Sequence, residues 1–284
     1  MSALAAEADR SDVERLSRRN FDRLARFIYE YSGIKMPPTK LTMLEGRLRR
    51  RLRATGIEGL DAYCSYLFDQ GGLEHEAIHL IDVVTTNKTD FFREPQHFDF
   101  LRDVALPDLA GAGHRQLRVW SSACSSGAEP YTLAMVLEEF FGPAGSPYVI
   151  LATDLSTDML GVAHRGVYPR QMLSPVPTAM RRRHVMESRE AQRGEVRIHA
   201  RLRSKVGFGR LNLMDERYAV GDAMHVIFCR NVLIYFDKPT QARVLSRLCD
   251  RLTPGGYLFI GHSESIAGID LPLRQVSNTI FQRV

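Results

Sequence analysis

The chain has 284 residues, which is long for one domain and enough to bury a sizeable core. Apolar residues make up 44% and charged residues 25%, ordinary globular values that exclude collagen, coiled coil and wholesale disorder. No apolar run approaches the roughly 20 residues of a membrane helix. The formal net charge of +5 predicts an acidic partner, which could be nucleic acid, anionic lipid or protein.

The first part of the chain shows helical patterns, and no strand pattern precedes about residue 115. Apolar residues recur at helical intervals over 24–31, 60–68 and 75–85. In the stretch 40–53, leucines form one apolar stripe, and arginines crowd the other faces. These arginines are Arg47, Arg49, Arg50, Arg51 and Arg53. We therefore predict a small helical domain over residues 10–85.

From about residue 115 onward, apolar strands alternate with helices. Strands are predicted at 117–121, 148–156, 206–213, 224–229 and 256–263, and helices at 129–141 and 239–252. This alternation indicates an α/β fold with a doubly wound, mostly parallel sheet, which binds ligands at the carboxyl ends of its strands. The segment from about 165 to 206 interrupts the rhythm. Its period-two residues Val196, Ile198, Ala200 and Leu202 predict an inserted, small antiparallel β-subdomain with a basic strand pair.

The stretch 120–134 runs from a strand through small residues and one glycine into a helix. Small residues let a cofactor approach the backbone closely, yet neither a phosphate loop nor a dinucleotide glycine motif is present. Glu129 at the helix start would repel a pyrophosphate and suits a cofactor with a cationic amine or sulfonium. The alternative is that Glu129 is only a first-turn acid, which stabilises a helix by roughly 0.3–1 kcal/mol.

Polar residues also follow the later strands. Asp154 could accept hydrogen bonds from both ribose hydroxyls of a nucleoside, or it could open a surface turn before the next helix. Asn212-Leu213 could frame an adenine, with the amide at its edge and the leucine on its face. Arg230-Asn231 follows a buried run. The alternatives for these positions are turn formation for the asparagines and a surface ion pair for the arginine.

Six blocks of the chain together carry a family resemblance. They are TTNKTDFFRE (85–94), WSSACSSGAEPYT (120–132), TDLS (153–156), NL (212–213), CRNVLIYFDKPTQ (229–241) and LTPGGYLFIGHSES (252–265). In this order they closely resemble the chemotaxis receptor glutamate methyltransferases, the CheR family. The match spans nearly the whole chain, so it is far more specific than a lone glycine motif.

The resemblance implies a class I S-adenosylmethionine-dependent methyltransferase. Its parts would be the helical domain 10–85, a linker and helix at 86–115 that contribute to the cofactor pocket, and a methyltransferase domain at 116–284 with its β-subdomain at about 180–206. The implied cofactor is S-adenosylmethionine, with S-adenosylhomocysteine as its product, and no metal is expected. The four cysteines lie far apart without zinc-binding spacing, which favours free thiols in a reducing cytosol.

The resemblance also assigns roles to individual residues. The implied cofactor-binding residues are Asn87, Thr89, Arg93, Glu129, Asp154, Asn212, Leu213, Arg230 and Asn231. Glu129 would meet the methionyl end, Asp154 the ribose and Asn212-Leu213 the adenine. Arg93 and Tyr235 are the catalytic candidates, because they would orient the incoming substrate carboxylate.

The implied activity is methylation of specific glutamate side chains on membrane chemoreceptors, which gives glutamyl methyl esters in chemotaxis adaptation. A carboxylate is already nucleophilic at neutral pH, so positioning would supply most of the catalysis, on the order of 7–11 kcal/mol. The partners would be the receptor's cytoplasmic domain, met by the arginines of 40–53, and a receptor C-terminal peptide of the kind that the family's β-subdomain can dock. Residues 185–195 depart from the family's glycine-richer sequence there, so whether this chain uses such a peptide stays open. We expect a cytoplasmic monomer recruited to receptor arrays, without nucleic acid or membrane insertion.

Two other functions stay open on the residues alone. The basic charge would also suit a nucleic-acid methyltransferase, although the chain lacks the Asn/Asp-Pro-Pro-Tyr/Phe motif of amino methylation. A signalling scaffold could bind the cofactor without turnover. Retention on nucleic acid at physiological salt would favour the first alternative.

Overall fold

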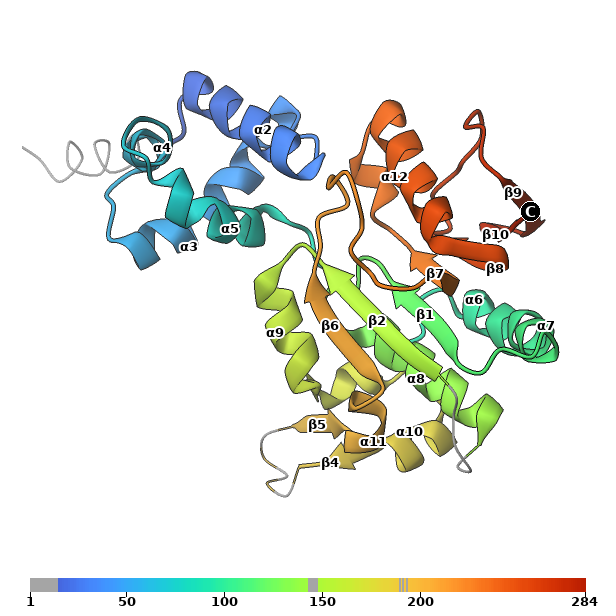
Figure 1. The fold of residues 1–284 in the computed structure, drawn as a ribbon. Helices are drawn as coiled ribbons and strands as arrows, with labels where there is room; N and C mark the ends of the chain where they lie inside the picture. Colours follow the sequence, from blue (N-terminus) through green and yellow to red (C-terminus); the bar gives the residue numbers. More distant parts are fainter. Residues whose placement is uncertain (1–14, 143–147, 189, 191, 193) are drawn as a thin grey trace, which may run out of the picture. The chain divides into compact units, whose positions relative to one another are not determined.

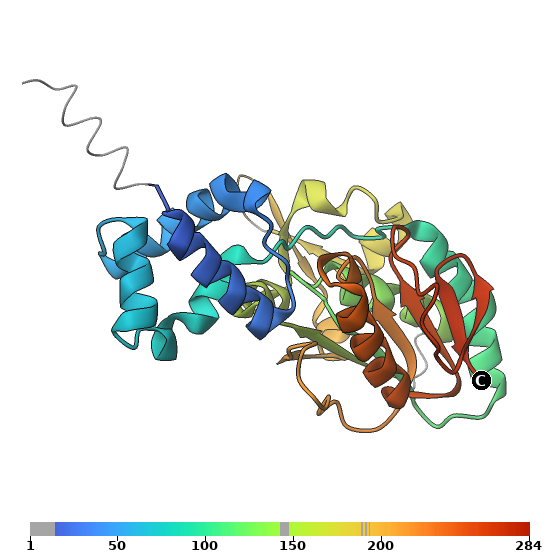
Figure 2. The same cartoon turned by 90° about the horizontal axis from the view of Figure 1, so that it is seen from above.

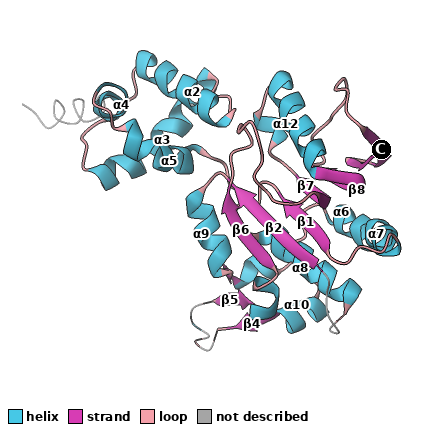
Figure 3. Ribbon diagram, in the orientation of Figure 1, coloured by secondary structure: helices cyan, strands magenta, loops and turns pink. Residues whose placement is uncertain are grey.

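The computed structural model describes residues 15–142, 148–188, 190, 192 and 194–284. Its contacts divide it into two units, one of residues up to Thr86 with Tyr235–Asp237, and one of Asn87–Ile234 with Lys238–Val284. All described strands belong to the larger unit (Figure 3). Residues 10–14 of the predicted helical domain lie outside the described part. No described helix is long and apolar enough to cross a membrane.

The smaller unit is helical. Its elements are α2 (Arg18–Ser32), the 3-10 helix η1 (Pro38–Lys40), α3 (Leu41–Thr55), α4 (Leu60–Asp69) and α5 (Leu73–Val84). Helix α2 begins at Ser17, whose side chain accepts a hydrogen bond from the Asn20 N–H, and ends at Gly33, which has a left-handed φ of 74°. Leu44 and Leu48 of the predicted stripe are completely buried, so the apolar face of α3 forms part of this core.

The larger unit begins with a helical segment that precedes its first strand. The segment consists of α6 (Pro95–Phe100), the π-helical turn η2 (Leu101–Ala105) and α7 (Leu106–Gly111). Pro95 stands in the first turn of α6, where a missing N–H costs nothing. Figures 1 and 2 show the C-terminal strands beside this segment, and Asp108 accepts hydrogen bonds there from Tyr257 (2.8 Å) and Gln282 (3.3 Å).

A seven-stranded sheet forms the centre of the larger unit, in the order β6-β2-β1-β7-β8-β10-β9. Its strands are β1 (Leu117–Ser121), β2 (Tyr148–Asp154), β6 (Val206–Arg210), β7 (Met224–Cys229), β8 (Leu252–Ile260), β9 (Leu273–Ser277) and β10 (Ile280–Arg283). The first five in spatial order are parallel, and β10 runs antiparallel to both of its neighbours, β8 and β9. The mostly parallel α/β sheet predicted from the sequence is therefore confirmed.

Three helices connect and cover these strands: α8 (Ala128–Phe141), α9 (Thr157–Arg165) and α12 (Lys238–Arg251). Figure 1 shows α8 behind the sheet, where it contacts β2, while α12 contacts β8. The chain runs from β1 outward to β2 on one side, and later places β7 on the other side of β1. This reversal of strand order makes the boundary between β1 and β7 a topological switch point, and doubly wound sheets bind ligands at the carboxyl ends of the strands there. The four cysteines are buried free thiols.

A separate three-stranded antiparallel sheet, in the order β3-β5-β4, confirms the predicted insertion. Its elements are β3 (Val167–Pro169), η3 (Arg170–Leu173), α10 (Thr178–His184), β4 (Val185–Glu187), β5 (Glu195–Ile198) and α11 (Ala200–Arg203), several of which are labelled in Figure 1. The sheet therefore starts before residue 180. The strand predicted from the period-two pattern does not continue beyond Ile198. The His199 side chain caps α11 instead, and Leu202 is a buried residue of that helix.

Candidate cofactor and methyl-transfer site

The loop between β1 and α8 needs a glycine at one position. Gly127 has a φ of 90°, and a Cβ there would lie 2.8 Å from the Cβ of Ala163 and 2.9 Å from the Tyr168 hydroxyl. Ser125 also has a left-handed φ of 49°. The small residues of this loop thus allow a tight backbone turn that brings the start of α8 under the strand ends.

Glu129 lies in the first turn of α8 with its side chain only 12% exposed. One oxygen accepts a hydrogen bond from the Ser121 hydroxyl at 2.7 Å, and the other accepts one from Nη1 of Arg230 at 2.9 Å. Burial raises the pKa of Glu129, and the charge of Arg230 and the bond from Ser121 only partly oppose that rise. The carboxylate is therefore more than a first-turn helix acid, because it is mostly shielded from solvent and is oriented by Ser121 of β1 and by Arg230 just after β7.

Arg230 follows β7 and joins two carboxylates. Its side chain is 1% exposed, and Nη2 donates to Oε2 of Glu94 at 2.9 Å and to the carbonyl of Arg93. The surface ion pair considered from the sequence is wrong, because this guanidinium is buried between Glu94 and Glu129. Two carboxylates and one guanidinium leave a formal excess of one negative charge, which suits a cationic ligand.

The segment around Arg93 is strained. Phe92 and Glu94, on either side of it, have left-handed φ values of 51° and 57°, each costing roughly 1–3 kcal/mol. The bonds that Arg230 makes to the Arg93 carbonyl and to Glu94 hold this conformation, and the Arg93 guanidinium itself donates to the carbonyl of Lys88 at 2.9 Å. Strain of this kind is found mainly at functional sites, which supports a role for Arg93.

Glu94 is the counterpart of Glu129 on the other side of Arg230. Burial works to raise the pKa of Glu94, but hydrogen bonds from Asn231 and Arg230 prevail and lower it to about 2. Nδ2 of Asn231 donates to Oε1 of Glu94 at 3.0 Å. Glu94 is thus ionised at neutral pH and ties the linker segment to the turn after β7.

Asp154 at the end of β2 organises the neighbouring loop. Its Oδ2 accepts the backbone N–H of Ser125 at 2.7 Å, and its Oδ1 accepts that of Ser156 at 2.9 Å. The Ser125 hydroxyl in turn donates to the carbonyl of Asn87 at 2.8 Å. The structure therefore brings together Asn87 and Asp154 beside the β1–α8 loop. Thr89 lies half-buried in the same linker.

Asn212 forms a turn, as the simpler sequence interpretation held. Its Oδ1 accepts a hydrogen bond from the backbone N–H of Met214 at 3.0 Å, and its own backbone N–H donates to Oδ2 of Asp215 at 3.3 Å. Leu213 is buried, and its carbonyl accepts the Tyr218 hydroxyl at 2.8 Å. The turn fixes this pair just beyond β6, and contact with an adenine stays a prediction.

Sequence reasoning missed two acidic residues of this region, Glu94 and Glu264. Glu264 accepts backbone hydrogen bonds from the turn that carries Asn231, at 3.0 Å for that residue's N–H. Both glutamates lie within the blocks 85–94 and 252–265 that carry the family resemblance. That signal could have identified them, but no local pattern distinguishes either from a surface acid.

Glu94, His97 and His262 could each offer a ligand atom to a metal, within 4.8 Å of one another. The Glu94 oxygen that faces both histidines already accepts a hydrogen bond from Arg230 at 2.9 Å. A dication there would lie beside the buried guanidinium and be repelled by it. The group fits the ion network around Arg230 better than a metal site.

Tyr235 groups with the helical unit rather than with the strand ends. Lys40 places its ammonium 5.9 Å from the centre of the tyrosine ring. Nearby, Asp237 accepts the Tyr29 hydroxyl at 2.7 Å and pairs with Lys35 at 3.7 Å. The predicted position of Tyr235 at the transferred methyl group therefore stays a prediction.

The five arginines of α3 fall into two groups. Arg47 donates to the carbonyls of Val84 and Thr85 at the end of α5, and Arg51 makes a two-pronged bond to Glu76 at 2.7 and 3.0 Å. These two arginines hold the helical unit together. The other three are exposed: Arg49, Arg50 and Arg53. They are the members of the predicted receptor-binding set whose side chains face solvent.

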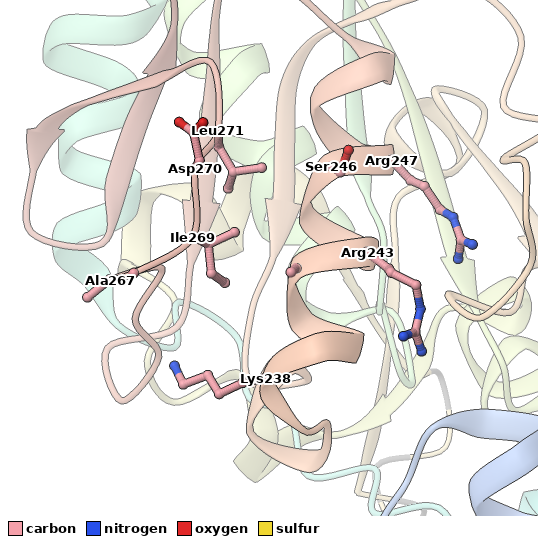
Figure 4. Close-up of a pocket in the computed structure, with 10 residues that line it drawn as sticks. Lys238, Arg243, Ser246, Arg247, Ala267, Ile269, Asp270 and Leu271 are labelled. Atoms are coloured by element: carbon pink, nitrogen blue, oxygen red, sulfur yellow. The ribbon is translucent and has the colours of Figure 1, made fainter.

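A pocket of about 800 Å³ lies between α12 and the loop 267–271 (Figure 4). Its lining residues are Lys238, Ala242, Arg243, Ser246, Arg247, Ala267, Gly268, Ile269, Asp270 and Leu271. In Figure 4 the side chains of Arg243 and Arg247 point away from that loop. The pocket is distinct from the residues gathered around Glu129 and Asp154.

Comparison with known proteins identifies the family of both units. The family model "CheR methyltransferase, SAM binding domain" matches residues 87–281, and "CheR methyltransferase, all-alpha domain" matches residues 19–85. The chain is 36% identical to chemotaxis protein methyltransferase 2 of Pseudomonas aeruginosa, with 93% of each chain covered. It is 38% identical to the chemotaxis protein methyltransferase of Salmonella typhimurium, with 89% of this chain and 86% of that protein covered.

The residues present fit S-adenosylmethionine as the cofactor. The excess negative charge at Glu94, Arg230 and Glu129 suits its ammonium and sulfonium groups, and Asp154 stands at the strand end where a ribose is held. The larger unit is a SAM-binding methyltransferase domain, and the helical unit is the all-alpha domain that accompanies it. The chain therefore belongs to the CheR methyltransferase family.

Proposed function

We propose that this protein transfers a methyl group from S-adenosylmethionine to glutamate side chains of chemoreceptors, as a protein-glutamate O-methyltransferase. The cluster of Glu94, Arg230 and Glu129 carries the proposal, because its excess negative charge is suited to a sulfonium cofactor. The curated relatives are named chemotaxis protein methyltransferases, which supports a chemotaxis substrate. The glutamate specificity is our inference from the family resemblance.

S-adenosylmethionine supplies a sulfonium methyl, whose carbon bonds to a carboxylate oxygen while the C–S electron pair returns to sulfur. Glu129 would hold the ammonium of the methionyl end, and Asp154 the ribose hydroxyls. Because the incoming carboxylate has no proton to lose, the chain needs no general base. Arg93 and Tyr235 would orient the substrate carboxylate, without gripping it so tightly that its ground state is favoured over the transition state.

Tyr235→Phe tests this orienting role. We expect the variant to lose turnover much more than affinity for S-adenosylhomocysteine, because the hydroxyl would act on the substrate and not on the cofactor. Calorimetry of product binding and initial rates with receptor membranes separate the two effects. A large loss of affinity with unchanged turnover would contradict the role.

The exposed arginines of α3 would meet clustered acidic residues on the receptor, and the β-subdomain would dock a receptor C-terminal peptide. In this proposal the protein acts as a cytoplasmic monomer at membrane receptor arrays. The double variant Arg49→Glu, Arg53→Glu should methylate the receptor less, and its activity should depend less on salt. Both side chains are exposed, and reversing their charge would remove the attraction to acidic receptor residues. Unchanged methylation at low and high salt would exclude this surface as the receptor contact.

The deciding experiment is incubation of the purified protein with tritiated S-adenosylmethionine and receptor-containing membranes. Release of methanol by mild base, only when receptor is present, would establish glutamyl ester formation. Label that enters the receptor but resists base would show methylation at nitrogen or another stable site. Product binding without any label in receptor would favour a cofactor-binding scaffold.

A further inference from the structure

The turn after β7 contains a residue in the left-handed region. Asn231 has a φ of 57°, a conformation that asparagine tolerates better than most residues with a side chain. Its amide donates to Glu94, and the preceding Arg230 joins Glu94 to Glu129. The geometry of the whole charged cluster therefore depends on what holds this turn in place.

A single carboxylate holds it. Oε2 of Glu264 accepts the backbone N–H of Asn231 at 3.0 Å and that of Gly261 at 2.6 Å, and Oε1 accepts the N–H of Ile234 at 3.3 Å. Glu264 is only 7% exposed. Burial raises the pKa of Glu264, and these backbone donors oppose that rise. An ionised carboxylate with several N–H donors is one of the stronger hydrogen-bonding arrangements in a protein.

Gly261 makes the close approach possible. A Cβ at this position would lie 2.5 Å from Nδ2 of Asn231, 2.8 Å from its backbone nitrogen and 2.9 Å from Oε2 of Glu264. Those distances are too short for any side chain, so the end of β8 can meet the turn only as a glycine. The segment 261–264 and the turn after β7 thus form one fitted unit, although about 30 residues separate them.

We propose that Glu264 is a positioning residue of the cofactor site, which acts through Asn231 and Arg230 to keep Glu94 and Glu129 oriented. The carboxylate replaces the water that would otherwise solvate the backbone of the turn, and it fixes the side chains that the turn carries. The inference deepens the proposed function, on which it rests for the reaction. Its test, however, needs only cofactor-product binding and no methyl acceptor.

The test compares Glu264→Gln with the wild type and with Glu216→Gln, an exposed glutamate of the same unit. Glutamine keeps one acceptor oxygen but turns an NH2 toward backbone donors. We expect amide hydrogen exchange, read by NMR, to quicken about tenfold or more at one or more of Asn231, Ile234 and Gly261. We expect the dissociation constant of S-adenosylhomocysteine, read by calorimetry, to rise roughly tenfold.

The conservative variant Glu264→Asp keeps the charge with a shorter reach, and should restore part of both effects. It also serves if the glutamine variant does not fold. Exchange at the amide of Val119, in the core strand β1, is read alongside, because general destabilisation would quicken exchange there too, whereas a local effect would not. Unchanged exchange at all three amides would overturn the proposal, and so would faster exchange with unchanged product affinity. If wild-type protein bound product but methylated no receptor, the proposed substrate would fail and this inference would stand.

Discussion

Replacing Arg230 by methionine would remove a buried cation that lies between two partly buried carboxylates. Its guanidinium lies 2.9 Å from Glu129 and 2.9 Å from Glu94, and it also binds the carbonyl of the strained Arg93. Methionine has a similar length but offers no donor. The variant would leave two nearby carboxylates without their cation, in a region where their side chains are only 12–13% exposed.

Breaking a buried ion pair by removing one partner typically costs about 3–5 kcal/mol. For domains of this size, each kcal/mol lowers the melting temperature by roughly 2–4 °C, so we expect a drop of about 6–20 °C at neutral pH. The estimate applies because the Arg230 side chain is 1% exposed, so solvent screens the interaction little. The affinity for S-adenosylhomocysteine should fall as well, since Glu129 loses its orientation.

Thermal unfolding followed by circular dichroism measures the effect, with Arg243→Met as the matched control on the exposed surface of α12. The double variant Arg230→Met with Glu94→Gln should recover part of the lost melting temperature, because it removes one of the two carboxylates that lack their cation. In the wild type the pKa of Glu94 is about 2, below its ordinary 4.5, so its stabilising contribution is complete above pH 4.5 and lost as the pH falls toward 2. The difference in melting temperature between Arg230→Met and the wild type should therefore become smaller as the pH falls toward 2.

The reasoning would be refuted if Arg230→Met melted within about 2 °C of the wild type at neutral pH. It would also fail if the double variant were no more stable than the single one. Either result would mean that water reaches the cluster and solvates the carboxylates as well as the guanidinium does.

Three further predictions follow from the same region. Gly261→Ala should cost roughly 1–3 kcal/mol in unfolding free energy, because its Cβ would clash with Asn231, whereas Gly209→Ala, with open space around it, should not; chemical denaturation measures both. Asp154→Asn should weaken product binding at least tenfold, or roughly 1.4 kcal/mol, and calorimetry that shows no change would remove Asp154 from the site. Because burial raises the pKa of Glu129, that carboxyl takes up its proton at a higher pH than an ordinary glutamate, and product affinity should begin to fall above pH 4.5 as the pH is lowered. The Glu129→Gln variant should lose this dependence of product affinity on pH. If wild type and variant showed the same dependence on pH, Glu129 would not hold the ammonium.

Local pattern was sufficient for much of the fold. The strands at 117–121 and 224–229 were predicted with their observed bounds, because each is a short apolar run that ends at a polar residue. The hairpin of β9 (273–277) and β10 (280–283) was not predicted. Its first strand is mostly exposed and its second is half-buried, so neither shows a clear alternation of apolar and polar residues.

The sequence by itself determined the family, most of the order of strands and helices along the chain, and the acids that follow β1 and β2. Only the tertiary structure decided which charged groups meet. Arg230 comes from the end of β7, Glu129 from α8 and Glu94 from the linker, and the seven-stranded order places them side by side. Periodicity reports whether a side chain faces the core or the solvent, whereas an ion pair depends on which distant segments the sheet makes neighbours. For that physical reason the buried cluster and the Glu264 contacts were visible only in the folded chain.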